Sequence, residues 1–314
     1  MQNSIPGLLH LVSARNVRIR AWFQRRWPFL RERIHQYALL ARVDHPIGAF
    51  LLLWPTLWAL WIAAEGVPPL HLLLVFVLGV FLTRSAGCVL NDLADRRYDP
   101  HVQRTRSRPL VTGRVGGGEA FALASILLGL AFLLVLTTNR LTVLLSFVAI
   151  PLAVIYPYMK RYTYVPQFFL GLAFSWGIPM AFAAQSNSVP QMAWILFIAN
   201  ILWVVVFDSI YAMVDREDDL RIGIKSTAIL FDDADRHIIG IIQGMFIVVL
   251  IILGRQLELG MFFNCALLAA VALIVYHQIL IRKRAREDCF RAFLSNNWLG
   301  LIIFVGIALD YHFD

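Results

Sequence analysis

Two stretches of the sequence place oxygen-bearing side chains at helical spacing. The first stretch carries Asn91, Asp95 and Asp99. The second carries Asp208, Tyr211, Asp215 and Asp219. Because residues three, four, seven or eight apart share one side of a helix, each stretch predicts a column of oxygen ligands on one face. Such ligands suit Mg²⁺, a hard cation whose coordination is usually completed by substrate phosphates. Two columns facing each other would bind a diphosphate through Mg²⁺.

The alternative interpretation is that these acids pair with neighbouring arginines at a wet surface, where exposed ion pairs are common. The occurrence of two matching columns favours the metal–diphosphate site. Basic residues expected on the same side of the protein are Arg108, Lys160, Arg161 and Lys225. Lys and Arg clamps stabilise an anionic leaving group as its bond breaks, so these side chains are candidates to bind the diphosphate.

The composition predicts that membrane helices position these columns. Of the 314 residues, 59% are hydrophobic and 15% are charged, against roughly 45–50% and about 25% in soluble domains. A soluble globule of this size would have too little polar surface to cover itself. The three cysteines are far apart, which argues against a disulfide scaffold.

Nine apolar runs approach the roughly 20 residues that a helix needs to cross a bilayer. They fall at about 47–64, 70–90, 119–137, 141–158, 165–184, 192–213, 237–254, 261–281 and 294–310. The predicted fold is therefore an all-α bundle of nine transmembrane helices around a central cavity, which an isoprenoid tail could fill. This single membrane-embedded domain covers residues 46–314. The preceding residues 1–45 form an Arg-rich cytoplasmic segment, expected to be an amphipathic lead-in that touches anionic lipid.

The positions of the basic residues predict the orientation of the chain. With a cytoplasmic N-terminus, all of the 28 Lys and Arg residues except Arg140 and Arg255 fall on the inner side or its helix ends. This asymmetry follows the positive-inside rule and fits a bacterial inner membrane.

The two acidic stretches also carry a family resemblance. Asn91-Asp92-x-x-Asp95-x-x-x-Asp99 resembles the NDxxDxxxD motif of the UbiA superfamily of intramembrane aromatic prenyltransferases, and Asp215-x-x-x-Asp219 resembles its second DxxxD motif. Over about residues 40–314 the chain is most similar to the branch that prenylates 4-hydroxybenzoate in ubiquinone synthesis. The stretches that carry this similarity are HPIGAFLLLWPTLWALW (45–61), RSAGCVLNDLADRRYD (84–99), RTRSRPL (104–110), YPYMKRYTYVPQ (156–167), IPMAFAA (178–184) and YAMVDREDDLRIGIKSTAILF (211–231).

The resemblance implies a reaction and a set of site residues. Mg²⁺ and a polyprenyl diphosphate would be held by Asn91, Asp95, Asp99, Asp215 and Asp219, and the diphosphate would be steadied by Arg108, Lys160, Arg161 and Lys225. Ionisation would give an allylic cation that attacks the 4-hydroxybenzoate ring ortho to its hydroxyl. Asp215 could take the ring proton. Arg42 and Arg161 would be candidates for the substrate carboxylate.

Two alternatives remain at this point. The acceptor could instead be haem, a naphthoate, a chlorophyllide or a glyceryl phosphate, with the same chemistry at the diphosphate. A transporter could also use acids within the membrane, but it would place them at broken helices near mid-membrane. The acids here fall at helix ends on one side, which favours the enzyme.

Overall fold

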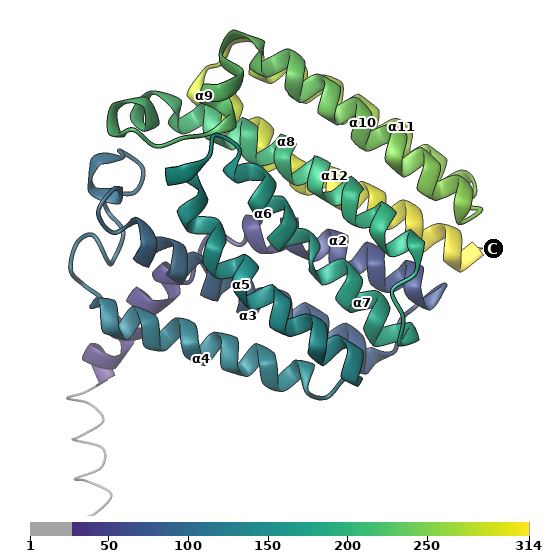
Figure 1. Ribbon diagram of the computed structural model, residues 1–314, viewed down its shortest axis with the longest axis horizontal. Coiled ribbons are helices and arrows are strands. Elements are labelled where there is room, and N and C mark those ends of the chain that lie inside the picture. Colours follow the sequence, from purple (N-terminus) through teal and green to yellow (C-terminus); the bar gives the residue numbers. More distant parts are fainter. Residues whose placement is uncertain (1–26, 314) are drawn as a thin grey trace, which may run out of the picture.

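The computed structural model describes residues 27–313, and every regular element within them is helical (Figure 1). Nine segments of this part of the chain are long and apolar enough to cross a membrane, which confirms the predicted bundle. A helix over residues 27–40 comes first. The elements that follow are α2 (Ile47–Ala64), α3 (Leu70–Asp95), η1 (Asp99–His101), α4 (Gly117–Val135), α5 (Arg140–Tyr162), α6 (Pro166–Ser175), α7 (Gly177–Ser186), α8 (Gln191–Ile222), α9 (Thr227–Phe231), η2 (Asp232–Ala234), α10 (Asp235–Gln256), α11 (Met261–Leu280), η3 (Ile281–Lys283) and α12 (Arg286–Phe313).

Proline and glycine residues set most of the helix boundaries. Helix α3 begins directly after Pro69, and α8 begins directly after Pro190. Proline is tolerated at a helix start because the first N–H groups have no partner inside the helix. Helix α8 ends at Gly223, whose φ of 73° lies in the left-handed region that glycine adopts without a steric penalty.

The fifth span, residues 166–186, is divided into α6 and α7 at Trp176. Pro179 accounts for the break because it has no N–H to bond the carbonyl of Ser175, one turn earlier. Gly177 follows the break, and a Cβ there would lie 3.2 Å from Thr56 Oγ1. The division therefore lets this span pack closely against α2.

The end of α3 corrects one sequence prediction. Asn91 and Asp95 do share a helix, but α3 ends at Asp95, and Asp99 begins the short η1. Pro100 contributes to the difference, because it has no N–H to bond the carbonyl of Arg96, one turn earlier, in a continued α-helix. The predicted single column Asn91–Asp95–Asp99 is thus two segments joined by a turn.

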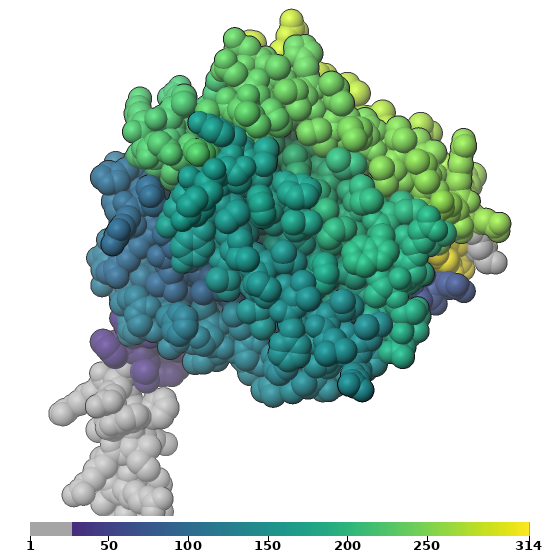
Figure 2. All heavy atoms as spheres, viewed as in Figure 1, coloured from purple at the N-terminus to yellow at the C-terminus, as the bar shows by residue number. Residues whose placement is uncertain are grey.

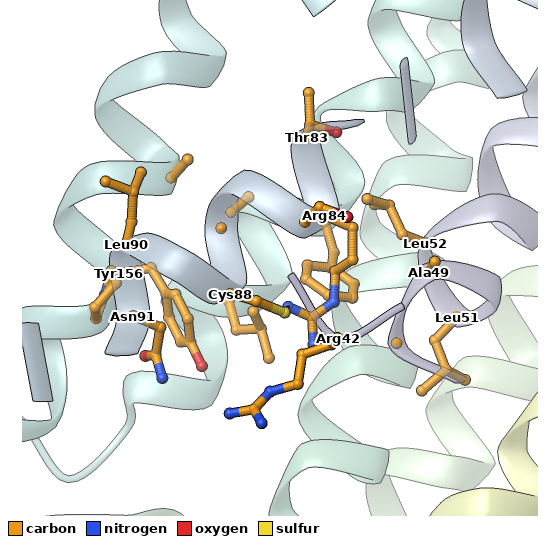
Figure 3. A pocket seen from close by; sticks show the side chains of 18 of the residues that line it. Arg42, Ala49, Leu51, Leu52, Thr83, Arg84, Cys88, Leu90, Asn91 and Tyr156 are labelled. Carbon is orange, nitrogen blue, oxygen red and sulfur yellow. The ribbon is translucent and has the colours of Figure 1, made fainter. Parts of the chain in front are cut away.

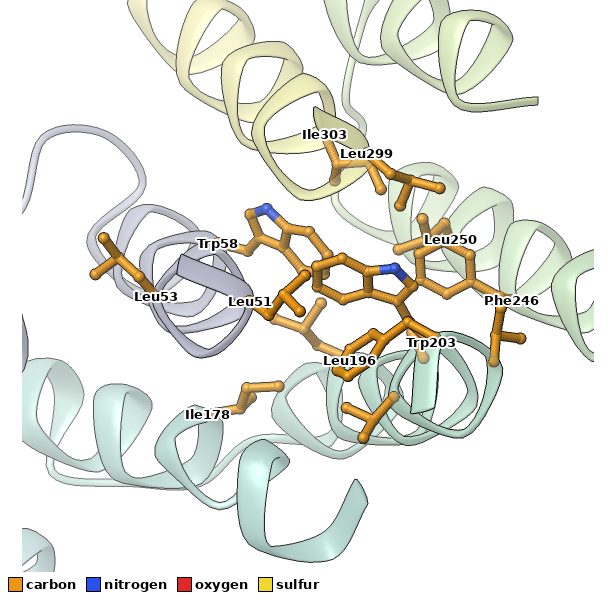
Figure 4. Close-up of a cluster of buried hydrophobic side chains, with 14 of the residues drawn as sticks. Leu51, Leu53, Trp58, Ile178, Leu196, Trp203, Phe246, Leu250, Leu299 and Ile303 are labelled. Atoms are coloured by element: carbon orange, nitrogen blue, oxygen red, sulfur yellow. The ribbon is translucent and has the colours of Figure 1, made fainter. Parts of the chain in front are cut away.

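Tryptophan side chains join four spans at the centre of the bundle. The indoles of Trp58 on α2 and Trp203 on α8 are fully buried and lie 5.3 Å apart between ring centroids (Figure 4). Trp58 donates a 3.0 Å hydrogen bond to the carbonyl of Gly300, and Trp203 donates one of 3.0 Å to Asn296 Oδ1. Both acceptors belong to α12, while Phe246 of α10 stacks on Trp203. Burying large rings with their N–H groups satisfied fixes these helices relative to one another.

A second, smaller cluster packs around the beginning of α4. It consists of Leu40, Val89, Leu110, Val115, Ala120 and Ala124. Leu40 packs the end of the helix over residues 27–40 against α3 and α4. Of the predicted N-terminal segment 1–45, residues 1–26 lie outside the described residues. Side chains of α4, α5 and α6 cover the lower part of the face that is seen in Figure 2, and side chains of α10 and α11 cover the upper part. The C-terminal end of α12 lies far from α9, at the opposite end of the bundle (Figure 1).

Candidate active site

A cavity of about 1120 Å³ lies inside the bundle. One end of it is acidic and is lined by Asn91, Asp92, Asp95, Asp99, Asp208, Asp215 and Asp219. The other part is apolar and is lined by residues such as Val75, Phe76, Leu128, Phe132, Trp176 and Met180. The cavity therefore suits an amphiphilic molecule with a polar head and an apolar tail.

The first acidic stretch is held in place by basic side chains. Asp92 is 1% exposed, and its Oδ1 forms ion pairs with Arg42 Nη2 at 3.1 Å and with Arg108 Nη1 at 2.9 Å. Arg108 Nη1 also lies 2.7 Å from Asp99 Oδ2. Arg108 therefore links the end of α3 to η1, and the turn between them is fixed by charge as well as by backbone.

Asp95 is arranged differently from its neighbours. Its Oδ2 forms an ion pair with Lys160 Nζ of α5, while its Oδ1 is buried without a hydrogen-bond partner. A buried oxygen without a partner costs free energy unless something completes it. Asp95 thus lines the cavity with one of its two carboxylate oxygens, Oδ1, left without a partner in this structure.

The second acidic stretch lies on one continuous helix, as predicted. Asp208, Tyr211, Asp215 and Asp219 are all on α8, and all line the cavity. This helix has 32 residues, more than the roughly 20 needed to cross hydrocarbon. Its last turns therefore extend beyond the apolar layer, where carboxylates are tolerated.

Arg104 connects the two acidic stretches. Its Nη2 lies 2.5 Å from Asp215 Oδ2 and its Nε lies 3.3 Å from Asp215 Oδ1, so it grips the carboxylate with two donors. The guanidinium also lies 4.7 Å from the centroid of the Tyr211 ring. Burial opposes the charge of Arg104, but Tyr211 and Asp215 outweigh it and raise the pKa above its usual value. The loop after α3 is thereby fastened to α8.

The predicted basic residues divide into two groups. Arg42, Arg108, Lys160 and Lys225 line the cavity, as the sequence led us to expect. Lys225 Nζ donates to the carbonyl of Tyr162 at 3.2 Å. Arg42, the expected partner of a substrate carboxylate, is paired with Asp92.

Arg161 is placed differently from the prediction, because it is not among the residues that line the cavity. It donates to the carbonyl of Ala94, and its guanidinium lies 5.1 Å from the ring centroid of Tyr98 and 4.9 Å from that of Tyr158. Successive residues of a helix point about 100° apart. Because Lys160 faces the cavity, Arg161 next to it faces away, and we do not carry it into the proposed site.

Arg84 of α3 also lines the cavity and was not among the predicted site residues. Its Nη1 lies 2.9 Å from Cys88 Sγ, and its Nε is buried without a partner. Gly48 makes room for it, because a Cβ there would lie 2.5 Å from Arg84 Nη2. Figure 3 shows Arg84, Arg42 and Asn91 around the same cavity. Arg84 thus adds to the cavity lining a cation that has a donor without a partner, two turns before Asn91 on α3.

The acids are paired with basic residues rather than gathered into a ready-made metal cage. Across residues 27–313, no three His, Cys, Asp or Glu side chains lie close enough together to hold a metal ion. The donors nevertheless fit Mg²⁺, since they are all oxygens and Asp95 Oδ1 has no other partner. Phosphate oxygens would complete such a site.

Within the described residues, a nine-span bundle with one cavity that is acidic at one end and apolar elsewhere defines an integral membrane protein that can hold an amphiphilic ligand. The model of the UbiA prenyltransferase family matches residues 52–301. The 4-hydroxybenzoate octaprenyltransferase of Alkalilimnicola ehrlichii is 58% identical over 284 residues, which cover 90% of this chain and 97% of that protein. The chain belongs to the UbiA prenyltransferase family.

Solved structures share the fold at low sequence identity. A UbiA homolog from Aeropyrum pernix K1 superposes with a TM-score of 0.74 at 23% identity, over 83% of this chain and 97% of that one. A UbiA homolog from Archaeoglobus fulgidus, bound to GPP and Mg²⁺, gives 0.69 at 16% identity, over 88% and 99%. These likenesses confirm the predicted helical architecture.

Proposed function

We propose that this protein is a 4-hydroxybenzoate octaprenyltransferase of ubiquinone biosynthesis. It transfers the octaprenyl group of octaprenyl diphosphate to the ring carbon ortho to the hydroxyl of 4-hydroxybenzoate. The sequence predicts the reaction without a chain length, and the octaprenyl group follows from the relative that is 58% identical. The observation that carries the proposal is that both acidic stretches line one cavity whose remainder is apolar.

Asn91, Asp95, Asp99, Asp215 and Asp219 would hold Mg²⁺ together with the diphosphate. When bound, Mg²⁺ acts as a Lewis acid that withdraws electrons from the leaving diphosphate. A homolog of the same fold from Archaeoglobus fulgidus is bound to GPP and Mg²⁺, which supports the choice of these two ligands. Asp95 Oδ1, buried and without a partner, is the oxygen that most needs such a ligand.

Arg104, Arg108, Lys160 and Lys225 bind the diphosphate in this proposal. The first three now neutralise Asp215, Asp99 and Asp95. Cations that already lie beside the carboxylates can turn to phosphate oxygens without crossing the cavity. Their charge then stabilises the diphosphate as the carbon–oxygen bond breaks and the allylic cation forms.

The aromatic acceptor lies between the diphosphate and the apolar end. The carboxylate of the acceptor pairs with Arg42, as the sequence suggests, or with Arg84, whose Nε–H has no hydrogen-bond partner. The cation attacks the ring carbon ortho to the hydroxyl, which donates electron density. A carboxylate on the cavity face of α8, Asp215 or Asp208, takes the ring proton and aromaticity is restored. The apolar walls keep water from quenching the cation.

We further propose that the acidic end of the cavity faces the cytoplasm of a bacterial inner membrane. The loops at this end carry most of the basic residues, while Arg140 and Arg255 lie at the opposite helix ends. This distribution follows the positive-inside rule.

The test is the identity of the product. The purified protein in nanodiscs receives octaprenyl diphosphate, Mg²⁺ and an equimolar mixture of 4-hydroxybenzoate, a naphthoate, a chlorophyllide, haem and glyceryl phosphate. Mass spectrometry should find octaprenyl-4-hydroxybenzoate as the dominant product. Prenylation of another acceptor, with 4-hydroxybenzoate left unchanged, would overturn the assignment.

A further inference from the structure

The helix over residues 27–40 has one face fixed to the bundle. Leu40 is fully buried among Val89 and Ala120, and Gln36 is 3% exposed. Arg33 forms an ion pair with Glu119 and donates a 2.8 Å hydrogen bond to the carbonyl of Arg114. These contacts attach the helix to the beginning of α4.

A different face of the same helix is apolar and exposed. Trp27 is 54% exposed, Leu30 39% and Ile34 61%. Because these positions are three and four residues apart, they form one stripe along the helix. The stripe borders Arg33 and Tyr37, which contact α4, and points away from the buried Gln36 and Leu40. A water-facing helix would carry polar side chains on this stripe.

The attachment to α4 fixes the depth at which this stripe lies. Glu119 is in the first turn of α4, and α4 has 19 residues. At about 1.5 Å per residue, it spans roughly 28 Å, close to the roughly 30 Å of a bilayer's hydrocarbon core. The first turn of α4 therefore lies at the boundary between hydrocarbon and headgroups. Phe121, just beyond Glu119, is 63% exposed and continues the lipid-facing surface toward the helix.

The charges around the stripe match an anionic headgroup layer. Arg31 lies beside the stripe and is exposed, and Arg97 and Arg114 are exposed at the same end of the bundle. Basic residues beside an apolar stripe are typical of helices that lie in the plane of the interface and bind anionic lipid.

We propose that residues 27–34 are an interfacial segment, whose stripe of Trp27, Leu30 and Ile34 sits in the headgroup layer of an anionic bilayer. The inference depends on the membrane fold and not on the identity of the acceptor. The helix leads to Arg42, where the chain turns with a left-handed φ of 58° and the side chain pairs with Asp92 at the cavity wall.

A site-specific fluorescent label tests the proposal. Cys265 is exposed and is first replaced by alanine; the buried Cys88 and Cys289 remain, and their residual labelling is subtracted. Ile34→Cys on the stripe and Glu32→Cys, exposed on another side of the helix, each receive an environment-sensitive dye. The full-length protein is placed in nanodiscs that contain phosphatidylglycerol. Phe121→Cys serves as a control for a lipid-facing position.

The expected result is that a nitroxide-bearing lipid quenches the labels at positions 34 and 121, while aqueous iodide quenches the label at position 32. Adding Arg31→Glu, or using phosphatidylcholine alone, should reduce lipid quenching at position 34 but not at position 121. Iodide quenching at position 34 equal to that at position 32 would contradict the proposal. Protection of position 34 from both quenchers would overturn it as well, because another protein surface would then cover the stripe.

Discussion

At the scale of single residues, the cavity carboxylates and their basic partners form matched pairs. Lys160 forms an ion pair with Asp95, Arg108 with Asp92 and Asp99, and Arg104 with Asp215. Charges in a site of low dielectric constant need such partners, and the loss of one partner leaves the other uncompensated. The pairing interpretation and the metal–diphosphate interpretation of the acids are therefore compatible, because the same cations can serve a bound phosphate.

Asp95→Asn should lower the rate of product formation by roughly 100- to 1000-fold, in line with the loss of one strong electrostatic contact at a reacting centre. The variant removes the charge but keeps the shape of the side chain. Product made by the protein in nanodiscs is quantified by mass spectrometry, and the fold of each variant is checked by thermal unfolding. Asp233→Asn, at a side chain that is 94% exposed and outside the cavity, serves as the control. Equal rates for the two variants would remove Asp95 from the site.

Gly48→Ala should raise the KM for 4-hydroxybenzoate roughly 10- to 100-fold, because the added methyl group would displace the Arg84 guanidinium. The KM for octaprenyl diphosphate should change little. Gly79→Ala is the matched control: Gly79 also lines the cavity, but its added Cβ would meet nothing within 4 Å. Steady-state kinetics with each substrate varied in turn provides the measurement. An unchanged KM for 4-hydroxybenzoate would argue against Arg84 as the carboxylate partner.

Helical periodicity predicts which residues share a face but not what that face meets. It correctly grouped Asp208, Asp215 and Asp219, because α8 is uninterrupted. It could not separate Lys160 from Arg161, since the two are adjacent and both basic, and only the packing of α5 decides which one faces the cavity. Arg84 needed the structure for a similar reason: its free Nε depends on Gly48, which lies on a different helix.

At the scale of elements, the loop between α3 and α4 closes one end of the cavity. Arg104 fastens it to α8, and Arg108 fastens it to α3 and η1. The sequence predicted the helices on both sides of this loop from their apolar runs. It did not predict the early end of α3, because the spacing of Asp95 and Asp99 does not include the local effect of Pro100.

Arg104→Ala should raise the KM for octaprenyl diphosphate about tenfold, and it should make residues 96–116 more sensitive to protease. Both effects have one cause, since the variant loses a cation for the diphosphate and the attachment of the loop to Asp215. Arg106→Ala, at an exposed position in the same loop, should change neither property. Limited proteolysis and kinetics are measured on the same preparations. If Arg104→Ala behaves like Arg106→Ala, the attachment has no role.

At the scale of the whole molecule, composition predicts most of the architecture. Nine apolar runs predicted nine spans, and the structure extends several of them at the acidic end: α3 to Asp95, α8 to Ile222 and α12 back to Arg286. Hydropathy underestimates the length of these helices because the turns at their acidic-end termini lie outside the hydrocarbon and carry polar residues. The shape of the cavity could not be predicted, since it depends on how the spans pack around Trp58 and Trp203.

The proposed orientation predicts which loops face the cytoplasm. A cysteine at exposed Arg106 should react with a membrane-impermeant maleimide only in inside-out vesicles, because the basic loops are retained inside. A cysteine at exposed Ser188, between α7 and α8, should react only in intact spheroplasts. Both variants carry Cys265→Ala so that the exposed native thiol is absent. The opposite labelling pattern would show that the orientation is inverted.

The account depends most on α3 and α8 acting together on one Mg²⁺–diphosphate headgroup. The most direct measurement is the binding of octaprenyl diphosphate to the purified protein in nanodiscs, with Mg²⁺ or with EDTA, for the wild type, Asp95→Asn and Asp215→Asn. We predict tight binding that requires Mg²⁺ in the wild type and is lost in both variants. Binding that persists in EDTA, or that survives the loss of either carboxylate, would contradict the central claim.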